Sequence, residues 1–245
     1  MPFGNHRLQR IIRGINRFHG EPSRKERLPI TRGLLIRILS LLDANDPRDA
    51  NLYGTFCIAH VGFLRAGEVT WTANDLIHGH TEFAQWNLTR RSIQFEEDRL
   101  LLTLPSSKTD PFPKGVTITL SASSDAACPV TAMGHLYELC PSWTPLAPLF
   151  ARPPGDGPGS EAFTREYLVQ HLRELLGQLG VRGAYSGHSF RRGSATSGKA
   201  AGLADNKIQL LGRWSSNAYQ AYIDYHPEQV FQIARRFQNS PEHSP

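Results

Sequence analysis

The stretch "LLGRWSSNAYQAYIDYHPEQ", residues 210–229, contains three tyrosines, Tyr219, Tyr222 and Tyr225, each three residues from the next. Aromatic residues at this spacing on a helix usually share one packed face. One of the three phenols could instead be a nucleophile, because a tyrosine oxygen can form a covalent intermediate with a substrate. The stretch alone leaves both interpretations open, and the other motifs of the chain are needed to choose between them.

Length and charge narrow the class of protein. The chain has 245 residues, enough for one large domain or two small ones. Its 27 Lys and Arg against 22 Asp and Glu give a net charge of +5 and a pI of about 9.3, which favours a polyanionic partner. No apolar run approaches the roughly 20 residues of a membrane span, so we expect no membrane partner.

The three cysteines, Cys57, Cys128 and Cys140, give little sign of a disulfide framework or a zinc ribbon. Their number is odd and no two have CxxC spacing. Cysteine usage therefore favours a reducing compartment. The "HGH" of His78 and His80 has no partners at a recognisable ligand spacing, so no metal site is expected.

Periodicity and turn signals predict an α+β fold that is mainly helical, with a small antiparallel β-sheet. Helices are expected at 1–20, from Thr31 to residue 42, from residue 50 to 62 or 65, at 128–139, from Thr164 to about 180, and in short pieces over 187–237. The segment "NDPRDA" is expected to break the chain between the first two of these helices. Extended runs at 92–95, 100–104 and 116–120, separated by turn residues, predict three strands of a small antiparallel sheet.

Three further motifs carry charged side chains at positions that need explaining. "GFLRAGEV" places Arg65 directly after an apolar helix, with Glu68 close by, and "LTLPSSKTDPF" places Lys108 in a turn after a strand. "GHSFRRGSAT" places His188 and Arg191 at the start of a helix, where backbone donors favour an anion. An Arg65–Glu68 ion pair and a solvated turn lysine are the plain alternatives, and each motif alone is weak.

Taken in order, Arg65, Lys108, His188, Arg191, Trp214 and a late tyrosine resemble the catalytic set of the tyrosine recombinase, or phage integrase, family. "FLRAGE", "GHSFRRGSAT" and "IQLLGRWSSNAYQAYI" resemble successive boxes of that family. The resemblance covers about residues 28–230. The "GRWSS" form, with Trp in place of His, is most similar to Crypton-type mobile-element recombinases.

The resemblance implies DNA strand cleavage and rejoining through a covalent 3′-phosphotyrosine, without metal or small-molecule cofactor. Two guanidiniums, Arg65 and Arg191, would hold the phosphate oxygens, with Glu68 supporting the first of them. Lys108 would protonate the leaving oxygen, and His188 would position the phosphate or accept the phenol proton. Trp214 would donate its indole N–H to a phosphate oxygen.

Spacing favours Tyr222 as the nucleophile. It follows Trp214 by eight residues (222 − 214 = 8), one fewer than is usual for the family, while Tyr219 is four residues too early. Further candidates for contact with DNA phosphates, chosen on charge alone, are Arg192, Arg213, Lys199 and Lys207.

The expected domain organisation is a catalytic domain over residues 28–237. Residues 1–27 resemble the end of an N-terminal DNA-clamp domain plus a linker, and 238–245 form a disordered tail. The resemblance also implies double-stranded DNA as partner, a homo-oligomer that is a tetramer on DNA, and the nucleus as compartment.

Two other functions remain open at this stage. The chain could be a catalytically silent, domesticated DNA-binding remnant, in which residues 194–223 form a helix–turn–helix with Gly202 in the turn. It could also be a protein-interaction domain whose basic charge is incidental.

Overall fold

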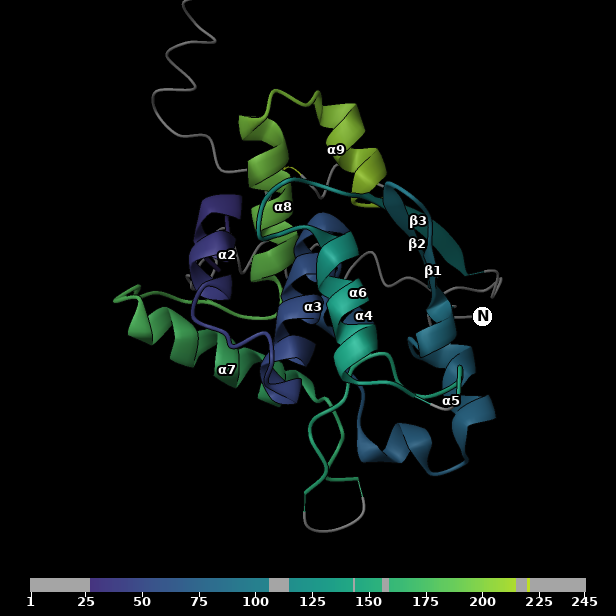
Figure 1. Cartoon of the computed structure of the whole chain (residues 1–245). Coiled ribbons are helices and arrows are strands. Elements are labelled where there is room, and N and C mark those ends of the chain that lie inside the picture. Colours follow the sequence, from purple (N-terminus) through teal and green to yellow (C-terminus); the bar gives the residue numbers. More distant parts are fainter. Residues whose placement is uncertain (1–26, 106–114, 143, 156–158, 215–219, 221–245) are drawn as a thin grey trace, which may run out of the picture.

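The computed structural model describes residues 27–105, 115–142, 144–155, 159–214 and 220. Within them the chain is α+β and mainly helical, as predicted (Figure 1). The helices are α2 (Arg32–Leu39), α3 (Pro47–Val61), α4 (Ala66–Val69), α5 (His80–Trp86), α6 (Pro129–Leu139), α7 (Arg165–Gln178), α8 (Ser189–Ala200) and α9 (Asp205–Leu211), with 3-10 turns η1 (Ala73–Leu76) and η2 (Arg90–Ser92). The expected N-terminal helix at 1–20 and the expected tail at 238–245 lie outside the described residues.

Capping residues set the starts of the helices that lead to the site. The Thr31 hydroxyl accepts from the Leu34 N–H to begin α2, as the sequence predicted. The break before α3 is shorter than predicted, because Asp46 caps that helix and Pro47 is its first residue. Proline suits the first turn of a helix, where its missing N–H is not needed.

Strands β1 (Ile93–Phe95), β2 (Arg99–Leu104) and β3 (Val116–Ser121) form one antiparallel sheet in the order β1-β2-β3. Its register pairs Ile93 with Leu102 and Leu102 with Ile118. On β2, Leu100, Leu102 and Leu104 are buried while Thr103 between them is exposed, which is the period-two pattern of a sheet with one covered face. All three strands were predicted, with bounds shifted by one residue at three of their six ends.

Helix α3 is the centre of the helical layer, with α2, α6 and α8 packed against it (Figure 1). It is buried along most of its length, and its Phe56 ring stacks on Phe190 of α8 at 5.2 Å between centroids. Helix α8 also meets the chain just before α2. A Cβ on Gly193 would lie 1.8 Å from the Ile30 carbonyl oxygen, so only glycine permits this approach.

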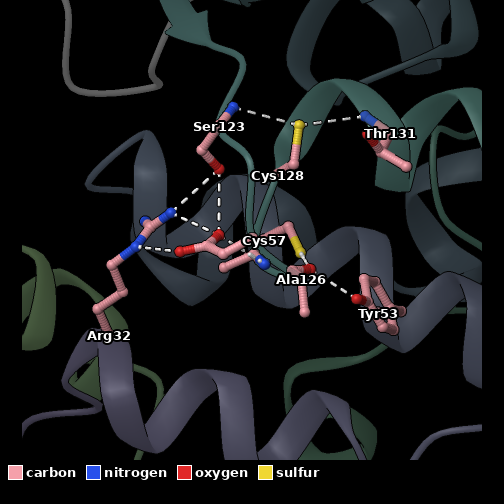
Figure 2. A network of polar contacts seen from close by, with 9 residues as sticks. Arg32, Tyr53, Cys57, Ser123, Ala126, Cys128 and Thr131 are labelled. Atoms are coloured by element: carbon pink, nitrogen blue, oxygen red, sulfur yellow. Dashed lines mark hydrogen bonds and ion pairs between the residues drawn. The ribbon is translucent and has the colours of Figure 1, made fainter.

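A polar network ties α2 to the loop before α6 (Figure 2). The Arg32 guanidinium binds Asp125 through two N–H donors, at 2.9 and 2.7 Å, and also donates to the Ser123 hydroxyl. The Cys128 sulfur caps α6 by accepting from the Thr131 N–H. The network fixes the sheet-to-α6 connection against the helical layer.

The sequence did not predict α5 or the single turn α4. Helix α5 has seven residues, of which Phe83 alone is buried, so it shows no apolar period to detect. No helix among the described residues is long and apolar enough to cross a membrane.

Candidate active site

Two helix ends with the same construction face the candidate site. Helix α3 ends at Gly62 and helix α9 at Gly212, and in each case the next residue is left-handed, Phe63 at φ 52° and Arg213 at φ 55°. The Leu64 N–H bonds back to the Ala59 carbonyl. The Trp214 N–H makes the equivalent bond to the Gln209 carbonyl. Both ends are therefore Schellman motifs.

Glycine usually occupies the left-handed position of this motif, because a side chain there costs on the order of 1 kcal/mol. Phe63 and Arg213 are the two non-glycine residues with positive φ in the described part of the chain. Both lie within two residues of a predicted site residue, Arg65 or Trp214. Backbone strain of this kind is concentrated at functional sites, where surrounding contacts hold it in place.

Arg191 joins the two helix ends. Its side chain is 1% exposed, and Nη1 donates to the Phe63 carbonyl at 2.6 Å while Nη2 donates to the Gly212 carbonyl. The Trp214 ring lies over the guanidinium, 4.1 Å from its carbon to the ring centroid. A buried guanidinium needs such partners, and two carbonyls fixed by Schellman motifs set the plane of its fork.

Gly212 makes the position of the tryptophan possible. A Cβ at residue 212 would lie 1.6 Å from the Trp214 ring, so any side chain would displace that ring from Arg191. Phe63 meets the same ring edge-on at 6.1 Å. The tryptophan is thus packed by the Arg65 loop on one side and stacked on Arg191 on the other.

The Glu68 carboxylate contacts two arginines, Arg65 and Arg213. Its carboxylate accepts the Arg65 backbone N–H at 2.6 Å and lies 3.5 Å from Arg65 Nη1. Arg213 Nη2 approaches the same carboxylate at 3.3 and 3.4 Å, and Arg213 Nη1 donates to the Gly62 carbonyl at 3.0 Å. The side chain of Arg65 is 55% exposed and that of Arg213 only 18%, so Arg65 is the one that can reach a ligand.

His188 stands beside these arginines at the start of α8. The preceding residue, Gly187, accepts the Ala66 N–H with its carbonyl at 3.3 Å, which joins the Arg65 and His188 segments directly. Partial burial, followed by the charges of Arg165, Arg65, Arg191 and Arg27, lowers the pKa of His188 below its ordinary value of 6.5. The imidazole is therefore neutral at neutral pH and able to accept a proton.

Comparison with solved structures shows which fold holds these residues. The chain superposes on XerH, a site-specific recombinase bound to its palindromic difH substrate, with a TM-score of 0.60 at 15% identity over 89% of this chain and 56% of that one. It has the fold of a tyrosine recombinase catalytic domain. XerA recombinase matches at 0.56 and 18% identity, over 94% of this chain and 69% of that one.

The Tn1549 transposon integrase, in complex with circular intermediate DNA, matches at 0.54 and 12% identity, over 88% of this chain and 66% of that one. The chain spans just over half of the length of the XerH structures that it matches. No family model matches the sequence. No curated protein matches it either.

Within this recombinase fold, the structure brings together Arg65, Glu68, His188, Arg191 and Trp214. Lys108, in the β2–β3 connection, lies outside the described residues, as do Tyr219, Tyr222 and Tyr225. Their roles stay predictions.

The four side chains chosen as DNA contacts on charge alone lie in different surroundings. Arg192 is 8% exposed, and Arg213 is engaged with Glu68 as described above. Lys199 forms an ion pair with Asp205. Lys207 lies on the exposed side of α9. Among the four, Lys207 is the side chain most open to solvent without a described ion pair.

Sequence reasoning did not find the partners of Arg191 or the proximity of Arg165 to His188. The partners are main-chain carbonyls, and the residue types in a sequence do not show which carbonyl a side chain will bind. The "GF" and "GR" pairs at 62–63 and 212–213 were the available signal, since glycine after an apolar helix often marks its end.

Proposed function

We propose that the chain cleaves and rejoins DNA strands in site-specific recombination or integration, through a covalent 3′-phosphotyrosine on Tyr222. The observation that carries the proposal is the position of Arg191. It is locked between the loop that bears Arg65 and the loop that bears Trp214, with His188 one turn away. These contacts support a role for Arg191, together with Arg65 and His188, in holding a phosphate.

The proposed reaction is a pair of phosphoryl transfers that need neither a metal nor an external energy source. The Tyr222 oxygen attacks the phosphorus and the bond from phosphorus to the 5′ oxygen breaks. Neutral His188 accepts the phenol proton and Lys108 gives a proton to the leaving 5′ oxygen. A 5′-hydroxyl then reverses the step, so the phosphodiester bond energy is retained.

The arginines supply the electrostatic stabilisation. Charge develops on the non-bridging phosphate oxygens in the transition state, and fixed guanidiniums aimed at that charge need no rearrangement when it appears. Loss of one such donor typically costs about 3–4 kcal/mol of barrier. Arg65 is exposed and oriented by Glu68, and Arg191 is oriented by the Phe63 and Gly212 carbonyls.

The proposal also covers the binding partner of the chain, its oligomeric state, its origin and its cellular compartment. Double-stranded DNA is the partner, held mainly by phosphate contacts, and the working form is a homo-oligomer, a tetramer on DNA. A Crypton-type mobile-element origin and a nuclear location follow from the "GRWSS" form of the tryptophan box. The DNA in the XerH and Tn1549 complexes supports the choice of partner.

A covalent-trapping experiment tests the proposal. The protein is incubated with nicked duplexes of randomised core sequence, in which the cleaved strand diffuses away, and the denatured mixture is run on a gel. We expect a protein–DNA adduct that persists in Tyr219→Phe and Tyr225→Phe and is lost in Tyr222→Phe. Adduct loss in a different one of the three variants would reassign the nucleophile.

A catalytically silent DNA-binding remnant is the second candidate. It is favoured by the geometry of α8 and α9, which are joined by a tight turn with Gly202 at φ 83°. This candidate predicts salt-sensitive binding to duplex DNA with no adduct from the wild-type protein. That combination would exclude strand cleavage by this chain.

A further inference from the structure

A groove of about 660 Å³ opens beside the candidate active site, between the first turns of α7 and the loop that precedes α8. The side chains and backbone that line it include Arg27, Arg165, Arg173, Glu166, Glu174 and Gly187. It is continuous with the site through Gly187, whose neighbour in sequence is His188 and whose carbonyl binds the Ala66 N–H. In the chemistry described above, Arg165 and Arg27 act only through their charge on His188, and no residue of the groove is given a step of its own.

Arg165 holds the end of the groove that is next to the site. It is the first residue of α7, and its Nε lies 3.4 Å from the point where Gly187 would carry a Cβ. The same Cβ would lie 2.4 Å from the Ala66 Cβ, so glycine is required for α7, α4 and the His188 segment to meet here. This close packing places the guanidinium beside the imidazole of His188.

The charges along the groove are poorly compensated. Arg165 and Arg27 are exposed, and neither forms an ion pair with a carboxylate in the described part of the chain. Glu174 accepts a hydrogen bond from Gln170, while Arg173 donates to the Tyr185 carbonyl. Arg165 also stands at the positive end of α7, where a cation is unfavourable, while Glu166 in the same turn offsets part of this repulsion. A bound anion would offset more of it.

We propose that this groove binds a flanking phosphate of the DNA strand whose neighbouring phosphate is held by Arg65 and Arg191, with Arg165 and Arg27 as the contacts. The inference rests on the proposed function, because it takes the same strand as ligand. A guanidinium fork fits a phosphate through two parallel N–H donors. The groove then adds a contact to the strand beyond the reacting phosphate, and this contact fixes the position of the strand along the site.

The salt dependence of DNA binding tests this assignment. The probe is a fluorescein-labelled duplex of random sequence, with binding followed by anisotropy over a series of NaCl concentrations. Each phosphate neutralised contributes about 0.9 to the slope of log K against log salt concentration. We expect Arg165→Gln to lower that slope by about 0.9, the double variant with Arg27→Gln to lower it by about 1.8, and Arg165→Lys to retain it.

Arg91→Gln is the matched control, because Arg91 is exposed, has no described ion pair and does not line the groove. An equal change of slope in this control would overturn the assignment, since the effect would then belong to net charge. The thermal unfolding midpoint of free Arg165→Gln should stay level or rise. A fall together with an unchanged slope would make Arg165 a structural residue only.

Two failures are distinguishable. If the wild-type chain shows no salt-dependent binding to the duplex, the proposed function itself fails. If the wild type binds and traps DNA covalently but Arg165→Gln keeps the full slope, the function stands and the groove assignment alone is wrong.

Discussion

The stability of this fold should depend on pH through one buried histidine. His60 lies on α3 and is 4% exposed, and its Nε2 has no hydrogen-bond partner among the residues that the structure describes. Its backbone carbonyl accepts from the Ser194 hydroxyl of α8, the helix that carries Arg191. Protonation of His60 would place a poorly solvated charge in the interface that positions the candidate site, and Ile30 and Asp125 would offset only part of its cost.

The size of the effect follows from the shift in pKa. Burial first, and then the positive charge of Arg32, lower the pKa of His60 from 6.5 to about 4, with Asp125 acting in the opposite direction. Between these two values the unfolded chain binds a proton that the folded chain does not. The contribution of His60 to the free energy of unfolding is therefore fully present above about pH 6.5 and is lost as the pH falls toward 4. A shift of about 2.5 units corresponds to about 3 kcal/mol.

Urea unfolding at a series of pH values between about 7 and 4 measures this loss. Other groups also titrate in this range, so the comparison is made with His60→Gln, which cannot be charged. We expect the free energy of unfolding of the wild type to fall by about 3 kcal/mol more than that of the variant. His78→Gln, at an exposed histidine, is the control and should follow the wild type.

If the free energy of unfolding of His60→Gln fell with pH as steeply as that of the wild type, His60 would not be the source of the pH dependence. In that case the imidazole is either protonated within the fold or reached by solvent, and the buried interface between α3 and α8 is not as tight as the structure indicates.

Two further predictions concern the site and the packing behind it. Glu68→Gln should slow single-turnover cleavage of a nicked duplex by roughly tenfold or more, because the charged partner that orients Arg65 is lost. The salt dependence of DNA binding should stay the same, and unchanged cleavage would remove Glu68 from the positioning of the site. Gly193→Ala should destabilise the fold by about 1–3 kcal/mol or more in urea unfolding, because its Cβ meets the Ile30 carbonyl, whereas Gly134→Ala in an open helix position should stabilise it by about 0.5–1 kcal/mol.

The sequence predicted most of the fold because the signals that carry it are local. Thr31, Thr164 and Pro129 mark helix starts at the positions where the structure has them. Extended runs between turn residues predicted β2 and its two neighbours. Helix α5 is too short to repeat an apolar pattern, so the sequence does not predict it. Helix α3 begins earlier than predicted, because Asp46 and Pro47 cap and start it as well as ending the preceding segment.

For the candidate site, too, some features could be predicted from the sequence and others could not. Residue types in a fixed order selected Arg65, Glu68, His188, Arg191 and Trp214, and the fold brings these five together. Charge alone says nothing of the partners that a side chain has within the fold, so the DNA contacts chosen from it stay predictions. Arg213 was chosen as a DNA contact, yet its guanidinium is engaged with Glu68 and the Gly62 carbonyl.

What the sequence by itself determined is the set of chemical groups and their order along the chain, together with the helices and strands that bear them. Only the tertiary structure decided which groups face one another. The Phe63 and Gly212 carbonyls come from segments far apart in the chain and meet on Arg191, and Gly187 brings Arg165 to His188. Contacts of this kind depend on the packing of α3, α7, α8 and α9 together, which no local pattern encodes.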